Sequence, residues 1–261
     1  MATIPKVLPP LPRQRDLERN VPNAAAFGWL SAGWRDLKVK PGTSLLYGFS
    51  VYVVSVAVVG GLFAFALDYI LFPAFAGFMV VGPLIAVGLY EKSRRISQGI
   101  PVTLTNMIFV RPSSGGQVLF MGALLGLLML FWIRAAVILY ALFYGLQPFP
   151  GLDDILPTLF GTPSGWALLV VGSLVGGLFA SFSFAISVFA VPMLLDRQVD
   201  ALTAMGTSMA LVWQNLQVML IWGAIVVALF VVGVATGLLG LIIVFPLLGH
   251  ATWHAYQEMR P

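Results

Sequence analysis

The chain has 261 residues, of which 59% are hydrophobic and only 9% are charged, with a formal net charge of +4. About 25% of residues are charged in soluble globular domains, so this composition excludes that class and indicates a membrane protein. The sequence contains no cysteine, which excludes disulfides, thiolate metal sites and cysteine nucleophiles.

Residues 1–22 form a basic, proline-rich tail. Prolines limit regular helix in this segment, so we expect it to be extended or disordered when alone, either as a solvated tail or as a strap along a partner. The basic residues of the chain lie next to apolar stretches, and no motif for nucleic-acid recognition is present. We therefore expect these residues to face anionic lipid headgroups rather than nucleic acid.

Residues 23–42 are predicted to hold one amphipathic helix. It is expected to run over 24–39, after a capping Asn23 and before Pro41. One face carries apolar side chains at three- and four-residue spacing: Phe27, Leu30, Trp34 and Leu37. Since the segment is too short and too polar to cross a membrane, we expect it to lie in the headgroup plane with this face toward lipid.

Residues 43–261 are predicted to form a transmembrane domain. A helix needs about 20 apolar residues to cross a hydrocarbon core of about 30 Å, and six stretches have about this length. These are residues 43–67, 69–90, 117–146, 165–195, 216–235 and 237–255. The predicted fold class is therefore an all-α membrane protein with six transmembrane helices and short amphipathic cytoplasmic helices.

The charges predict the orientation of these spans. All 14 Lys and Arg residues except Arg134 lie in segments that share one side of the predicted membrane, whereas the opposite connections carry only Asp68, Asp153 and Asp154. By the positive-inside rule, both termini are cytoplasmic and the chain makes three outward hairpins. We expect a multi-pass protein of the bacterial cytoplasmic (inner) membrane.

Three of the predicted spans contain a proline shortly before they become polar. Each proline removes a backbone hydrogen bond, so we expect a helix kink and a free carbonyl at a similar depth in each span. The prolines are Pro83, Pro192 and Pro246.

Arg134 is the one ionisable residue deep within a predicted span. A central Arg costs about 2.5–3.5 kcal/mol to insert, so its donors need partners. It could hold an anion, a lipid phosphate or a cofactor carboxylate, or it could form a salt bridge or extend to the outer surface. Asp68, at the first hairpin tip, is the predicted salt-bridge partner.

The two histidines, His250 and His254, lie four residues apart near the inner end of the last span. Two ligands do not complete a zinc site and nothing indicates a haem pocket, so we predict no metal and no cofactor. Glu91, Asp200 and His254 each lie eight residues after one of the three prolines. These groups could converge with His250 in a cytoplasmic polar cluster that binds or gates a cation, or they could simply mark where helices leave the membrane.

Short motifs in the first half of the chain resemble those of a bacterial family. The segments are 33–37 (GWRDL), Pro41, 82–84 (GPL) and 88–91 (GLYE). The family comprises predicted integral membrane proteins of unknown function, some of which are labelled putative cytochrome c oxidase subunit I. That label implies a catalytic subunit with many more histidine ligands than the two present here. The resemblance therefore implies at most an accessory role beside a membrane complex, with a respiratory complex as one candidate.

No nucleotide-binding, nucleophile-elbow or metalloprotease motif is present. We therefore predict a protein that is not an enzyme: an accessory, assembly or scaffold component that contacts membrane lipids and either other membrane subunits or further copies of itself. The alternative is a transporter or channel for a small solute or lipid, which the three prolines and Arg134 would favour. The acidic residues lie at the ends of the spans, which argues against coupling to protons or sodium.

Overall fold

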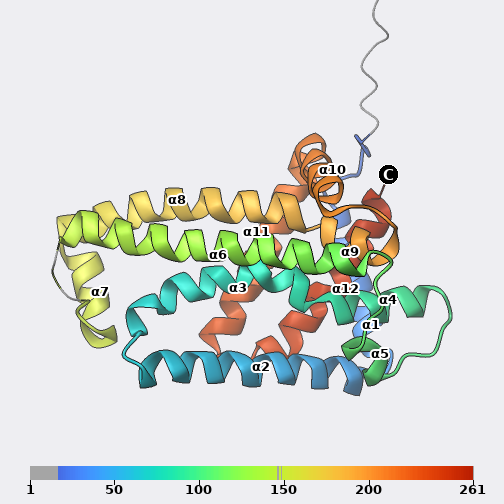
Figure 1. The fold of residues 1–261 in the computed structure, drawn as a ribbon, viewed down its shortest axis with the longest axis horizontal. Helices are drawn as coiled ribbons and strands as arrows, with labels where there is room; N and C mark the ends of the chain where they lie inside the picture. The colour runs from blue at the N-terminus through green and yellow to red at the C-terminus, as the bar shows by residue number, and fades with distance from the viewer. Residues whose placement is uncertain (1–16, 146, 148, 261) are drawn as a thin grey trace, which may run out of the picture.

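The computed structural model describes residues 17–145, 147 and 149–260, without the side chains of Leu152 and Asp153. Every element in this part of the chain is helical (Figure 1). The first six elements are α1 Ala25–Lys38, α2 Pro41–Ala64, the 3-10 turn η1 Asp68–Ile70, α3 Leu71–Ile85, α4 Val87–Ser97 and α5 Leu104–Ile108. They are followed by α6 Gly115–Tyr144, α7 Leu152–Gly161, α8 Pro163–Ser187, α9 Ala190–Asp196, α10 Ala201–Gln214, α11 Leu216–Ala235 and α12 Leu241–Met259.

Five helical segments of the described chain are long and apolar enough to cross a membrane. They are Pro41–Ala64, Asp68–Ser97, Gly115–Tyr144, Pro163–Asp196 and Leu216–Ala235. The sixth predicted span, 237–255, differs because its first four residues precede α12. The second half of α12 also carries His250, His254 and Glu258, which lower its hydropathy below that of the other five.

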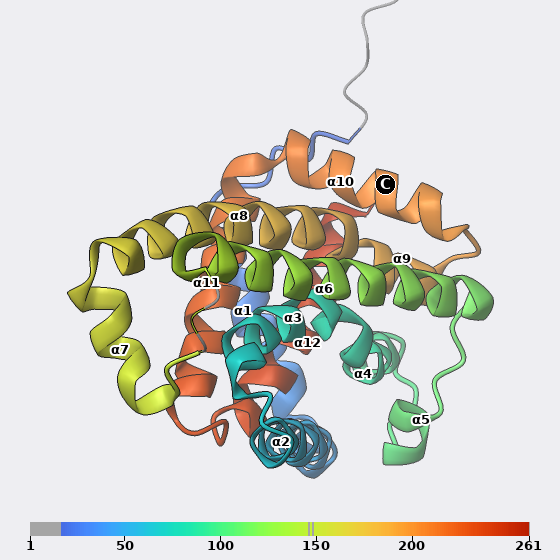
Figure 2. The same ribbon diagram turned by 60° about the vertical axis from the view of Figure 1, so that its left-hand side comes forward.

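The long helices α2, α3, α6 and α8 run roughly along one direction, and α11 and α12 lie at an angle to them (Figure 1). Helices α1, α4, α5, α9 and α10 gather toward one end of the bundle, which we call the α1 end (Figures 1 and 2). The opposite end carries α7 and is called the α7 end. Helix α12 is central at the α1 end, since it packs against α1, α2, α4 and α11.

The second long segment is divided into α3 and α4 at Ala86, three residues after Pro83. The Leu89 amide donates a hydrogen bond to the Ala86 carbonyl instead of the Ile85 carbonyl, so the Ile85 carbonyl has no donor within the helix. The Tyr47 hydroxyl of α2 donates to this carbonyl at 2.6 Å. A side chain from the neighbouring helix thus satisfies the group that the break releases.

A second break divides α8 from α9 at Val188 and Phe189, just before Pro192. The Ser208 hydroxyl of α10 lies in this break. It accepts from the Phe189 amide at 3.1 Å and donates to the Ala185 carbonyl at 2.7 Å, replacing the direct helical bond between these two groups. Helix α10 therefore takes part in shaping the α8–α9 junction.

Pro246 lies inside α12, which stays continuous. Because proline has no amide hydrogen, the carbonyl of Ile242 has no helical donor. Helix α2 approaches α12 at this place, and a Cβ on Gly48 would collide with the Ile242 carbonyl. The missing side chain of Gly48 is what allows the two backbones to meet.

The helix expected over 24–39 is observed as α1, and of the four apolar residues expected to face lipid, Leu37 is instead buried within the protein. Ala26, Trp29, Gly33 and Leu37 are buried against the rest of the protein, while Phe27 and Trp34 are exposed. A Cβ on Gly33 would lie 2.6 Å from the Ala251 amide nitrogen of α12. Close packing on α12, rather than the aromatic spacing, thus decides which face of α1 is buried.

The first sixteen residues of the predicted 1–22 tail lie outside the described residues. The end of the tail lies against the C-terminal part of the chain. Asn215 Nδ2 donates to the Leu17 carbonyl at 2.9 Å, and the Arg19 guanidinium donates to the carbonyls of Met259 and Arg260, each at 3.2 Å. This part of the tail is therefore bound along other elements of the same chain.

The packed core lies at the α1 end. Its largest fully buried apolar side chains include Trp222, Trp253, Tyr90, Tyr256 and Phe189. Along α2, α6 and α8, by contrast, many large apolar side chains are exposed, as expected where lipid replaces water.

Candidate functional site

His250 is fully buried in the centre of the α1 end and lies between two serines. Its Nε2 is 2.8 Å from Ser44 Oγ of α2, and its Nδ1 is 2.9 Å from Ser93 Oγ of α4. Both ring nitrogens therefore have hydroxyl partners, which a buried imidazole requires. The imidazole joins α12 to two other helices.

Lys92 of α4 is also fully buried and sets the direction of these hydrogen bonds. Its ammonium donates to Ser44 Oγ at 2.7 Å and to the Lys40 carbonyl at 3.3 Å. Because an ammonium only donates, the Ser44 hydroxyl hydrogen is left to point at His250 Nε2. The ring proton of neutral His250 is then on Nδ1, from which it is donated to Ser93.

His254 and Asp36 form the other end of the same network. His254 Nε2 lies 2.8 Å from Asp36 Oδ2 of α1, which is itself buried. Burial raises the pKa of Asp36, but hydrogen bonds from His254 and Ser93 and the nearby histidines outweigh it, so the pKa is lowered overall. Asp36 therefore remains an ionised acceptor close to His250 and Lys92.

These six residues form one hydrogen-bonded group that we call the buried polar network: Asp36, Ser44, Lys92, Ser93, His250 and His254. They come from α1, α2, α4 and α12. None of the six lines any of the three cavities described below. The arrangement is thus suited to holding four helices together, since a fully satisfied polar network specifies one packing of the elements that share it.

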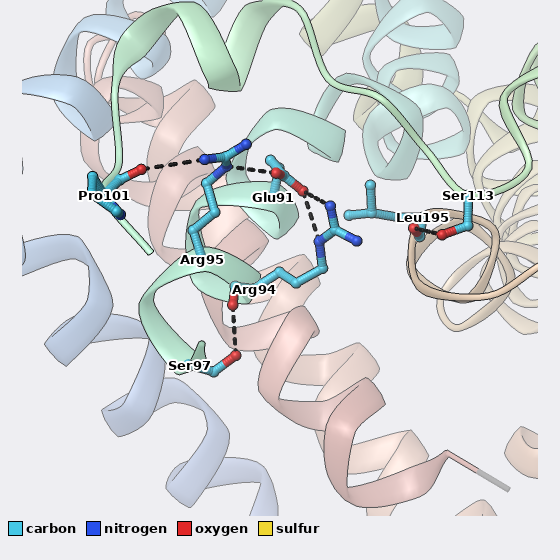
Figure 3. Close-up of polar contacts among 7 residues, drawn as sticks. All are labelled: Glu91, Arg94, Arg95, Ser97, Pro101, Ser113 and Leu195. Atoms are coloured by element: carbon cyan, nitrogen blue, oxygen red, sulfur yellow. Dashed lines mark hydrogen bonds and ion pairs between the residues drawn. The ribbon is translucent and has the colours of Figure 1, made fainter. Parts of the chain in front are cut away.

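The other two members of the predicted cytoplasmic cluster lie elsewhere. The buried Glu91 carboxylate binds Arg94 at 2.7 Å and Arg95 at 2.6 Å, as Figure 3 shows. Asp200 is exposed and caps α10 by accepting from the Thr203 amide at 2.9 Å, and this hydrogen bonding to Thr203 lowers its pKa. The structure therefore brings His250 and His254 into one network but does not join Glu91 or Asp200 to it.

The predicted polar cluster did not include four residues of this network: Asp36, Ser44, Lys92 and Ser93. A signal was present for three of them. Lys92 and Ser93 follow Glu91 directly at the end of an apolar run, and Asp36 belongs to the GWRDL motif. Nothing in the local sequence distinguishes Ser44 from the other serines of α2.

Arg134 and Asp68, the predicted salt-bridge partners, do not pair in the structure. Within the described residues neither side chain makes an ion pair or a hydrogen bond. The reason is the orientation of α6. Trp132 faces the bundle, where it donates to the Pro73 carbonyl at 3.0 Å and packs on Phe179. Arg134, two residues and about 200° further around the helix, is exposed on the outward surface.

A central cavity of about 140 Å³ lies where α3, α8, α11 and α12 meet. Most of its lining is apolar. Two lining side chains are fully buried and have a polar atom without a hydrogen-bond partner in the part of the chain that the structure describes: Ser183 Oγ and Trp222 Nε1. The cavity therefore has room and hydrogen-bonding groups for water or a small solute.

A much larger groove of about 1140 Å³ runs between α2 and α3. Met129, Phe230 and Leu241 from three other helices also line it. Helix α2 buries only Ser44, Gly48 and Val51, all in its first half. The second half of α2 is therefore separated from α3 by this apolar groove, which we call the lateral groove.

Comparison with known families gives a match in the central part of the chain. Residues 71–196 match the model of the family described as "Predicted integral membrane protein (DUF2189)". The similarity covers just under half of the 261 residues. The match confirms the resemblance to a membrane family of unknown function, and it includes Glu91, Lys92 and Ser93 but not the histidines. No curated protein and no solved structure is significantly similar to this chain.

The described residues contain no group of three His, Asp or Glu side chains placed to hold a metal ion.

Proposed function

We propose that this chain is a non-catalytic, multi-pass component of the bacterial cytoplasmic membrane that associates with a partner membrane protein through the lateral groove. Its setting would be a membrane complex, and the family resemblance makes a respiratory complex one candidate. Three features support this proposal: the arrangement of the spans, the α1 end held together by the buried polar network, and the open lateral groove.

The proposed topology has six spans in three outward hairpins, with the α1 end in the cytoplasm. Helix α1 packs on α12, and Trp29 Nε1 of α1 donates to Glu258 of α12 at 2.6 Å. The two terminal helices therefore share one end of the bundle, as an even number of crossings would place them. This supports α12 as the sixth span, with the one-sided Lys and Arg residues at the cytoplasmic end.

The lateral groove is the observation that carries the proposal. Its α2 lining runs from Leu46 to Leu62, about 24 Å at 1.5 Å per residue, which is most of the hydrocarbon thickness. The small residues Ser50, Ser55 and Ala74 in the lining let a second backbone approach closely. Length, apolar lining and small residues together fit one transmembrane helix of a partner.

Photo-crosslinking in native membranes tests this proposal. A photoreactive residue at Val54 faces the groove, and the same residue at Val56 is also exposed on α2 but lies outside the groove lining. We expect one discrete protein adduct from position 54 and none from position 56. Equal adduct patterns from both positions would contradict the proposal, and an adduct of twice the chain's mass would identify the partner as a second copy.

The central cavity favours a second function, the transport of a small solute. Transporter sites commonly lie near the membrane midplane at interrupted helices. The cavity is lined by Pro83, Ala86 and Val188, which mark the two helix breaks, and by the unpartnered Ser183 and Trp222. A solute-dependent rise in melting temperature that Ser183→Ala abolishes would support transport over the accessory role.

A further inference from the structure

A third cavity, of about 320 Å³, lies at the α1 end between α4 and α5. Three arginines line it, two from α4 and one that follows α5: Arg94, Arg95 and Arg111. The other lining residues are Glu91, Thr105, Asn106 and Phe109. We call this cavity the arginine pocket.

Two of the three guanidinium groups are held in place by Glu91. Arg94 Nε and Arg95 Nε donate to different oxygens of its carboxylate at 2.8 and 2.6 Å, and Arg95 also donates to the Pro101 carbonyl at 3.3 Å (Figure 3). Glu91 is buried, so this anchor lies beneath the two side chains. Their orientation is thus fixed before any ligand arrives, which reduces the entropy that binding would cost.

The pocket keeps a positive charge and spare donors despite this carboxylate. Three arginines and one glutamate give a formal charge of +2, from +3 and −1. The side chains of Arg111, Asn106 and Thr105 make no hydrogen bond or ion pair with other described residues. Guanidinium, amide and hydroxyl donors around one cavity are the groups that bind phosphate oxygens.

Apolar side chains beside the pocket indicate where the ligand comes from. Phe109, which lines the pocket, is 74% exposed, and the neighbouring Ile108 is 58% exposed. Large apolar residues next to exposed arginines are typical of a surface that lies in the membrane interface. A ligand with both a phosphate and an acyl chain would satisfy the arginines and cover these side chains.

We propose that the arginine pocket binds the phosphate of an anionic phospholipid headgroup. Arg94, Arg95 and Arg111 hold the phosphate oxygens, and the acyl chains lie against Ile108 and Phe109. A headgroup with a net negative charge is selected because a zwitterionic one places a second, positive group in a pocket of charge +2. Ile108 also lines the lateral groove, but the three arginines do not, so substitutions of the arginines test the pocket separately from the partner proposal.

Lipid binding to the purified full-length protein in detergent tests the proposal. Phosphatidylglycerol and phosphatidylcholine with the same acyl chains are titrated separately, and bound lipid is measured by native mass spectrometry alongside the melting temperature. We expect phosphatidylglycerol to be retained and to raise the melting temperature more than phosphatidylcholine. Arg111 is exposed and its side chain makes no bond to other described residues. Arg111→Gln should therefore weaken phosphatidylglycerol binding about tenfold, the contribution expected of one hydrogen bond to a charged group.

Arg35→Gln is the matched control, because Arg35 is an exposed arginine of α1 outside the pocket. It should leave phosphatidylglycerol binding unchanged. An equal loss in both variants, or no loss in Arg111→Gln, would overturn the pocket assignment. A thermal shift with inorganic phosphate alone as large as that with phosphatidylglycerol would assign the pocket to soluble phosphate and overturn the lipid assignment.

Discussion

The two ends of the bundle are built on different physical principles. At the α1 end, fully buried aromatic side chains surround the polar network of Lys92, His250 and their partners, and the backbones of α1 and α2 approach that of α12 closely at Gly33 and Gly48. Toward the α7 end, long apolar helices bury few of their side chains, and α2 stands apart from α3 across the lateral groove. Lipid is as apolar as these side chains, so there is no hydrophobic driving force to bring them together there. Buried polar groups, by contrast, must find partners.

The specificity of the fold therefore resides at the α1 end, while the lateral groove has space for another molecule. Substitutions at the α1 end should therefore cost far more stability than equivalent ones elsewhere.

The largest effect is expected from His250→Ala. The substitution leaves a cavity and removes a partner from two buried hydroxyls, Ser44 and Ser93, so it should lower the free energy of unfolding by about 3 kcal/mol or more. Denaturant unfolding in detergent measures the loss. Leu178→Ala, at an exposed position of α8, is the control and should change stability by less than about 0.5 kcal/mol. Similar losses in the two variants would mean that the network does not brace the α1 end.

A pair of identical substitutions within α2 compares the two regions directly. Gly48→Ala places a Cβ against the Ile242 carbonyl, a backbone group that cannot move aside, and should cost about 2 kcal/mol. Gly61→Ala, where nothing lies within 4 Å, should be neutral or stabilise by up to about 1 kcal/mol. Thermal unfolding of both variants checks this. The comparison fails if Gly61→Ala is the more damaging of the two.

A smaller effect is expected from Asp36→Asn, and it should depend on pH. Since the folded-state pKa of Asp36 lies below its ordinary value of 3.8, ionised Asp36 contributes stability above about pH 4. That contribution is lost as the pH falls through the lowered folded pKa. Asp36→Asn should cost about 1 kcal/mol at neutral pH and should show a shallower loss on acidification. Parallel acid-unfolding curves for variant and wild type would show that Asp36 makes no such contribution.

The smallest effect is expected from Arg134. Because it is exposed on α6 and does not pair with Asp68, Arg134→Gln should change stability by less than about 0.5 kcal/mol, and its effect should add to that of Asp68→Asn. A double-mutant cycle of melting curves measures the coupling. A coupling energy above about 1 kcal/mol would indicate that the two residues do meet.

Most of the membrane-spanning helices could be predicted from the sequence, because the length and hydropathy of an apolar segment are properties of that segment alone. Helix α1 was also predictable within one residue at each end. The packing of α12 against its neighbours could not be predicted from the sequence. Its apolar first half predicts a lipid-facing span, yet α12 packs against four helices at the α1 end, and that depends on where Gly33 and Gly48 meet it in space.

The candidate site was harder to predict for the same reason. Glu91, Asp200 and His254 were predicted to converge because each lies eight residues after a proline. That spacing is a distance along the chain, whereas the direction of each side chain depends on its position around the helix axis. Glu91 turns toward Arg94 and Arg95, while its neighbours Lys92 and Ser93 turn toward His250. Successive helical residues point about 100° apart, so one polar run serves two separate sites.

The central claim is that the α1 end is held in one arrangement while the lateral groove beside it is open. Distance measurements between paired spin labels test this claim most directly. The chain has no cysteine of its own, so cysteine pairs can be introduced cleanly. One pair, Arg35 of α1 and Ser97 of α4, spans the α1 end at exposed positions. The other, Val56 of α2 and Phe72 of α3, spans the lateral groove from exposed positions outside its lining. In nanodiscs containing the isolated protein, we expect a narrow distance distribution for the first pair and a broad one for the second. Equally narrow distributions for both pairs would contradict the claim.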